Sequence, residues 1–204
     1  TSVDGVFNRV NGTYGYGIGY ATPTIGGFVL SASWHDDDEW GVGLRWAQEF
    51  NGLRVAAAIG YANEDNNAQA GAGNDVDMVM GSVSVHHVPS GLFVTASAGQ
   101  KTTDALDAVI PDDNVGEHWY IKGGVKKAFS DLGATNIYGE YGEVAEFTDN
   151  TEGQMWGVGI EQDLDAVAST VYLNYRNWAA QTSSNGKDIG EDVSSVIGGM
   201  RVNF

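Results

Sequence analysis

Residues 193–204 read VSSVIGGMRVNF and alternate between apolar and polar positions up to the final aromatic residue. Val196, Met200 and Phe204 share one side of this pattern, and Arg201 falls on the other. Successive side chains of a β-strand point to opposite faces, so the stretch predicts a strand with one apolar and one polar face. The same alternation recurs along most of the chain, which predicts an all-β protein.

About eleven such strands can be traced from Thr13 onward, each of about nine to twelve residues, the length that crosses a bilayer on a tilt. Asn51-Gly52 is the strongest short hairpin signal among their connections. A soluble β-sandwich has no reason to sort its connections by length, whereas a membrane barrel places short turns at one end and long loops at the other. The expected long loops, which predict a transmembrane antiparallel β-barrel, are 36–39, 63–75, 103–115, 146–152 and 181–192.

Composition removes several classes of function. The chain has 204 residues, which is one domain by length, no cysteine and a net charge of −17. Without cysteine there is neither a disulfide framework nor thiol chemistry. The negative charge argues against a nucleic-acid partner, because no basic surface is available for phosphates. We expect no cofactor and no metal.

Two blocks of sequence resemble a known family. They are YATPTIGGFVLSASW (20–34) and GVGLRWAQEFNGLRVAAAIGY (41–61), and they look like the middle of alphaproteobacterial and related Gram-negative general porins. The C-terminal Phe204 is similar to the end signal of that family. One departure is Gly19, where the family commonly has an arginine before the tyrosine at position 20. The resemblance implies a homotrimeric, water-filled diffusion channel of about 16 strands in the outer membrane, in contact with lipid, ions and small hydrophilic solutes.

Strand number sets up two alternatives. Eleven antiparallel strands leave two open edges, which hydrocarbon does not tolerate. We therefore expect residues 13–204 to be the strands of a single barrel domain in the C-terminal part of a longer porin. Residues 1–12 would be the end of the constriction loop or an extra strand. The rival is a small complete outer-membrane barrel of about 10 or 12 strands.

Basic residues gather on the polar strand faces, and Lys127 is the one candidate for an apolar face. Charges on the lipid side of a barrel are costly, which alone can explain this bias. The family resemblance implies in addition a positive pore wall that sets up a transverse field, and the net negative charge favours cation preference. The candidate pore-lining residues are Arg45, Arg54, Lys101, Lys122, Lys126, Arg176 and Arg201.

Aromatic residues near strand ends predict the membrane girdle. Trp34, Trp40 and Trp119 fall on apolar faces, and the resemblance adds Phe204 as a girdle residue and insertion signal. Such rings sit at the boundary between hydrocarbon and headgroups. We expect a multi-pass barrel in the cell outer membrane.

The remaining polar motifs are weaker. Asp36, Asp37, Asp38 and Glu39 could coordinate Ca²⁺, although such a run is more often a solvated loop tip. Ser84 and His86 share a face, but nothing marks an activated nucleophile. We therefore expect a pore and not an enzyme, with a structural or adhesive barrel or a lipid hydrolase as the alternatives.

Overall fold

The computed structural model describes residues 16–35, 39–65, 75–103, 115–146, 151–182 and 191–202. They form one antiparallel sheet of eleven strands, each hydrogen-bonded to its neighbours in sequence, so the predicted all-β class and strand number are confirmed. No helix among these residues is long and apolar enough to cross a membrane. The strands are β1 (Gly17–Ala21), β2 (Phe28–His35), β3 (Trp40–Phe50), β4 (Leu53–Asp65), β5 (Asp75–His87), β6 (Leu92–Thr103), β7 (Val115–Ser130), β8 (Gly133–Glu146), β9 (Thr151–Leu164), β10 (Ser169–Thr182) and β11 (Val193–Val202).

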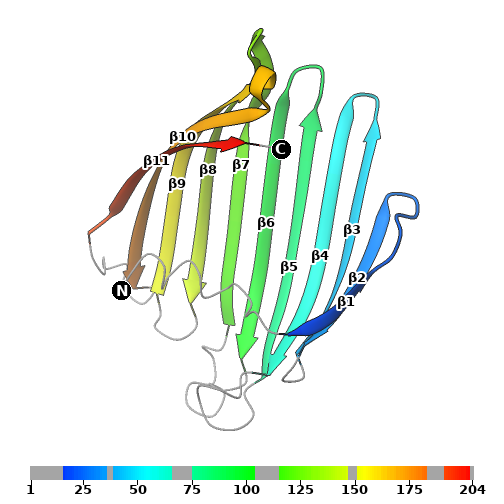
Figure 1. Ribbon diagram of the computed structural model, residues 1–204. Helices are drawn as coiled ribbons and strands as arrows, with labels where there is room; N and C mark the ends of the chain where they lie inside the picture. Colours follow the sequence, from blue (N-terminus) through cyan, green and yellow to red (C-terminus); the bar gives the residue numbers. More distant parts are fainter. Residues whose placement is uncertain are drawn as a thin grey trace.

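The sheet is rolled into an open trough, with β1 and β11 at its two edges (Figure 1). Within the described residues, β1 pairs with β2 and β11 pairs with β10. Strands β2 to β10 each have a partner on both sides, so their backbone groups are satisfied inside the sheet. Residues 1–12, expected as a loop end or an extra strand, lie outside the described part of the chain.

Short turns occupy one end of the trough, at the top of Figure 1. The Asn51-Gly52 turn has φ of 52° and 75°, the two positive values that a tight type I′ hairpin requires. A short 3₁₀ turn, η3 (Asp165–Val167), joins β9 to β10. The longer connections 66–74, 104–114 and 183–192 all leave from the opposite end. The predicted sorting of connections by length therefore holds for three of the five predicted long loops, because 36–39 and 147–150 have four residues each and the connection 22–27 at the other end has six.

Several strands are longer than the sequence predicted. β4 to β10 have 12 to 16 residues, and β7, with 16, is the longest. The expected loop 63–75 is shorter than predicted, because β4 runs to Asp65 and β5 begins at Asp75. Polar residues at these ends, such as Asp77, continue the pairing beyond the apolar stretch.

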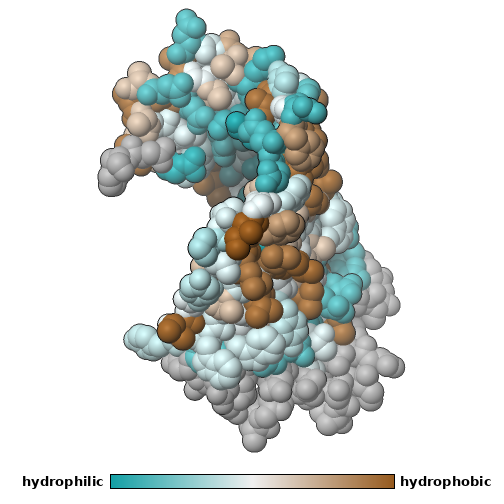
Figure 2. All heavy atoms as spheres, turned by 90° about the vertical axis from the view of Figure 1, so that its right-hand side faces the viewer, coloured by the Kyte–Doolittle hydropathy of each residue, from teal (hydrophilic) through white to brown (hydrophobic). Residues whose placement is uncertain are grey.

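The two faces of the sheet differ in polarity. We call the face that carries Trp34 the outer face and the face that carries Arg45 the inner face. Large apolar side chains on the outer face are exposed, for example Val158 (51%), whereas Glu140 on the inner face is 6% exposed. Side chains crowd together on the concave side of a curved sheet and spread apart on the convex side, which identifies the inner face as the concave one. Figure 2 agrees, with hydrophobic residues over the convex surface and a hollow on the other side.

Candidate functional site

The inner face is the candidate site, because strand pairing brings all the predicted pore-lining residues onto it. Lys122, for example, lies opposite Glu140 on β8, and Arg201 lies opposite Thr170 on β10. Lys127 lies on the outer face near the short turns, opposite Thr135. The seven inner-face basic residues are Arg45, Arg54, Lys101, Lys122, Lys126, Arg176 and Arg201.

One half of the inner face, over β1 to β6, is lined mainly by small side chains. A hollow of about 500 Å³ covers β1 to β4, and another of about 410 Å³ extends from β2 to β6 around Arg45. Arg45 is exposed and has no ion-pair partner within the described part of the chain. This half leaves open space above the sheet, and its small lining residues include Gly43, Ala56, Ala58, Ser82 and Ser84.

The other half carries a ridge of paired polar side chains. The Arg176 side chain reaches from β10 across β9 to Glu140 on β8. Its guanidinium donates to both carboxylate oxygens of Glu140, at 2.6 Å and 3.2 Å. The Tyr120 hydroxyl donates to the same carboxylate at 2.6 Å. Gly157 on β9 lies between Glu140 on β8 and Arg176 on β10. A Cβ there would come within 2.8 Å of Glu140 Oε1 and 2.9 Å of Arg176 Cγ, so glycine is what allows the pair to close.

A second ion pair lies nearer the short turns. Lys126 Nζ is 3.0 Å from Asp163 Oδ2, and the Thr170 hydroxyl donates to Asp163 Oδ1 at 2.8 Å. The Asn136 amide donates to Glu161 Oε2 at 3.0 Å. These bonds tie β7, β8, β9 and β10 together along the inner face.

Tyr138 fixes the position of a further cation. Lys122 Nζ lies 3.5 Å from the centroid of the Tyr138 ring, a cation–π geometry. The ring covers Gly159, where a Cβ would collide with the ring carbons and the hydroxyl. Sequence reasoning missed Tyr138 and Glu140 as members of the site. Their alternation with Ile137 and Gly139 was the available signal.

The positive charge of the expected pore wall is largely balanced by acidic residues on the same face. Among described side chains, the inner face holds seven basic and five acidic residues, an excess of two positive charges. Arg54, near the Asn51 turn, is paired with Glu49 at 2.7 Å. The charge of −17 for the whole chain therefore does not describe this surface. The acidic residues are Glu49, Glu64, Glu140, Glu161 and Asp163.

The predicted girdle tryptophans lie on the outer face toward the long-loop end. Each of two packs against a tyrosine of the next strand: Trp40 with Tyr61, at a ring separation of 5.2 Å, and Trp119 with Tyr141, at 5.3 Å. Trp34 lies opposite Trp40 and is 56% exposed. Phe204 is outside the described residues.

The remaining polar motifs have different partners from those considered in the sequence. Asp36 to Asp38 lie outside the described residues, and the described part contains no group of three or more His, Asp or Glu residues suited to a metal ion. The Ser84 hydroxyl forms a hydrogen bond with the Thr95 hydroxyl at 2.8 Å, whereas His86 Nε2 has no hydrogen-bond partner among the described residues. His87 Nδ1 instead lies 2.7 Å from the Ser90 hydroxyl, a pair that the sequence did not indicate.

Comparison with solved structures shows which fold the sheet belongs to. OmpT (in-vitro folded), an outer membrane protein of Vibrio cholerae, superposes with a TM-score of 0.57 at 16% identity over 90% of this chain and 62% of that one. Its trimer form gives 0.56 at 16% identity, with the same coverage. The chain has the fold of an outer-membrane β-barrel. It spans about three fifths of the length of these neighbours. No family model and no curated protein matches the sequence.

The barrel fold and the apolar outer face agree with the predicted location in the cell outer membrane. The prediction that the chain is not an enzyme is withdrawn. The neighbours are described as OmpT, an outer membrane protein, and not as pores. A barrel of this fold can carry catalytic as well as pore-lining side chains. Function has to be argued from the inner face and its neighbouring residues.

Proposed function

We propose that the protein forms a water-filled channel for passive diffusion of ions and small hydrophilic solutes, as a general porin of the type that the sequence resembles. One observation carries the proposal: the concave face combines a polar ridge with a half lined by small side chains. Glu140 and Arg176 on the ridge are charged groups that need water or each other. Ala58 and its neighbours leave room for that water.

Both signs of charge face the proposed lumen. Arg45, on the open half, has no partner among the described residues, whereas Glu140 is neutralised by Arg176. Rings and patches of charge set ion preference in such channels. The inner-face excess of positive charge favours anions inside the barrel, in contrast to the cation preference expected from the net charge.

Assembly as a homotrimer belongs to the same proposal. One solved neighbour is described as a trimer form, which supports this oligomeric state for a related fold. The outer face offers an apolar surface on every strand for lipid or for other copies of the chain.

Planar-bilayer recording of the purified protein tests the channel. We expect ohmic current steps, and we expect Ala58→Trp on the inner face to reduce their amplitude. Ala57→Trp is the matched control, because Ala57 is the neighbouring residue on the outer face. A protein that inserts without conducting, or equal effects of the two substitutions, would contradict the proposal.

The Ser90–His87 pair favours a second candidate function, hydrolysis of a lipid or peptide bond. A serine hydroxyl 2.7 Å from an imidazole nitrogen has the spacing of a nucleophile and its general base. The Ser90 hydroxyl also accepts the Leu92 N–H, as a turn-stabilising serine does. Release of acyl chains or peptides that disappears in Ser90→Ala and persists in Ser84→Ala would support this function, and no release by the wild type would exclude it.

A further inference from the structure

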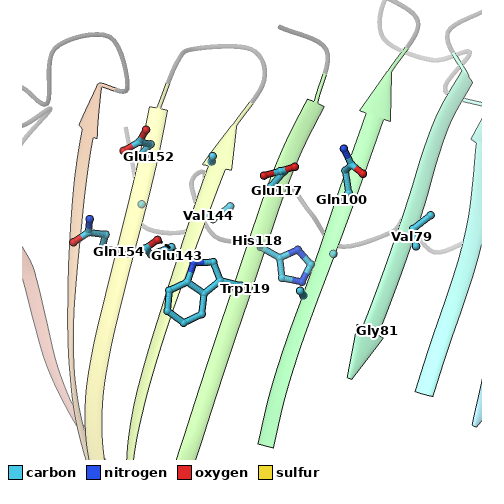
Figure 3. A pocket seen from close by; sticks show the side chains of 14 residues that line it. Val79, Gly81, Gln100, Glu117, His118, Trp119, Glu143, Val144, Glu152 and Gln154 are labelled. Carbon is cyan, nitrogen blue, oxygen red and sulfur yellow. Dashed lines mark hydrogen bonds between the residues drawn. The ribbon is translucent and has the colours of Figure 1, made fainter. Parts of the chain in front are cut away.

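The outer face carries a hollow of about 610 Å³ across β5 to β9, toward the long-loop end of the sheet (Figure 3). Val79, Gly81 and Ala98 form an apolar floor. This floor is continuous with the exposed apolar side chains further along the same strands, such as Val83 and Val94. The hollow therefore opens onto the surface that faces the acyl chains of the membrane.

Trp119 forms one wall of the hollow, and this residue is 42% exposed. In Figure 3 the ring lies across β7 and β8, with Glu143 beside it. The indole N–H donates to Glu143 Oε2 at 2.9 Å, and the Tyr141 hydroxyl donates to Glu143 Oε1 at 2.6 Å. These two bonds fix one carboxylate at the edge of an aromatic ring.

Two further carboxylates complete the rim. Glu117 is exposed and has no partner within the described chain, and Glu152 accepts a bond from Gln181 at 3.3 Å. Among the described residues, Lys127 is the single basic side chain on the outer face, and it lies at the opposite end of β7. No described cation therefore compensates the rim.

We propose that this hollow binds a membrane lipid whose headgroup carries an ammonium group. The carboxylates of Glu117, Glu143 and Glu152 complement a positive charge, and the Trp119 ring adds a cation–π surface. The apolar floor accepts the first methylenes of the acyl chains. A phosphate headgroup without an amine would meet three like charges. The proposal depends on the outer-membrane fold and is independent of channel activity.

Native mass spectrometry of the folded protein in neutral detergent tests the site. The probe is phosphatidylethanolamine, whose headgroup carries an ammonium group, and the reference is phosphatidylglycerol with the same chains, whose headgroup has a phosphate and no amine. We expect the first bound molecule of the ammonium lipid to have an affinity at least about five-fold higher than the first bound molecule of the reference lipid. This ratio is in line with about 1 kcal/mol per charge at a membrane surface. Salt should reduce this preference in the wild type, which gives a readout that needs no variant.

The double variant Glu117→Gln/Glu152→Gln should lose the preference, with circular dichroism confirming that it is folded. Asp77→Asn is the control, because Asp77 is an outer-face carboxylate outside the hollow. Equal affinity for the two lipids in the wild type would overturn the proposal. An equal loss in Asp77→Asn, or tighter binding of an anionic lipid with Mg²⁺, would also overturn it.

Discussion

Replacing Arg176 with methionine tests the polar ridge most sharply. The substitution keeps much of the side-chain length but leaves the Glu140 carboxylate, whose side chain has no exposed surface, without its charged partner. Breaking a buried ion pair by removing one member typically costs about 3–5 kcal/mol. The Arg176 side chain is 34% exposed, so water can replace part of the lost interaction. We therefore expect the free energy of unfolding to fall by about 1–3 kcal/mol.

The assay is equilibrium urea unfolding of the protein in phosphatidylcholine vesicles, followed by tryptophan fluorescence. The double variant Glu140→Gln/Arg176→Met removes both charges and should recover most of the loss, ending within about 1 kcal/mol of the wild type. A single variant that unfolds like the wild type would refute the reasoning. A double variant as unstable as the single one would refute it as well.

Three further predictions concern other parts of the sheet. Gly159→Ala should lower the free energy of unfolding by about 1–3 kcal/mol, because the added methyl collides with the Tyr138 ring. Gly139→Ala should change it by less than about 0.5 kcal/mol, because the atom nearest to the added methyl would be 3.9 Å away. Arg45→Glu should shift the reversal potential in a salt gradient toward cation preference, whereas the double variant Glu49→Ala/Arg54→Ala removes both members of an ion pair and should leave it unchanged. Val158→Arg, on the outer face, should cost about 2–4 kcal/mol in the same urea assay. An unchanged midpoint for Gly159→Ala or Val158→Arg, or a shift in the Glu49→Ala/Arg54→Ala variant as large as that of Arg45→Glu, would contradict these assignments.

Much of the fold was predictable because the signals are local. Alternation within one strand assigns each side chain to a face, and Asn51-Gly52 marks its hairpin through backbone φ alone. The seven basic residues came out on one face for the same reason. The ends of β4 and β5 were harder to predict, because polar residues such as Asp77 extend a strand beyond its apolar part.

The organisation of the site could not be read from the sequence, because it depends on pairing between strands. Arg176 and Glu140 are 36 residues apart and meet only because Gly157 on β9 lies between them. A shift in pairing by one residue would turn every side chain of a strand to the other face. The hydrogen bond between His87 and Ser90 is local, but it depends on the conformation of the turn between β5 and β6.

The central claim is that the inner face lines an aqueous lumen and the outer face does not. The chain has no cysteine, so single cysteines can be introduced at neighbouring positions of one strand. A charged, water-soluble thiol reagent added during planar-bilayer recording should react with Ala58→Cys and reduce the current, and should leave Ala57→Cys unaffected. Equal reaction at the two positions, or modification of Ala58→Cys without any change in current, would contradict the account.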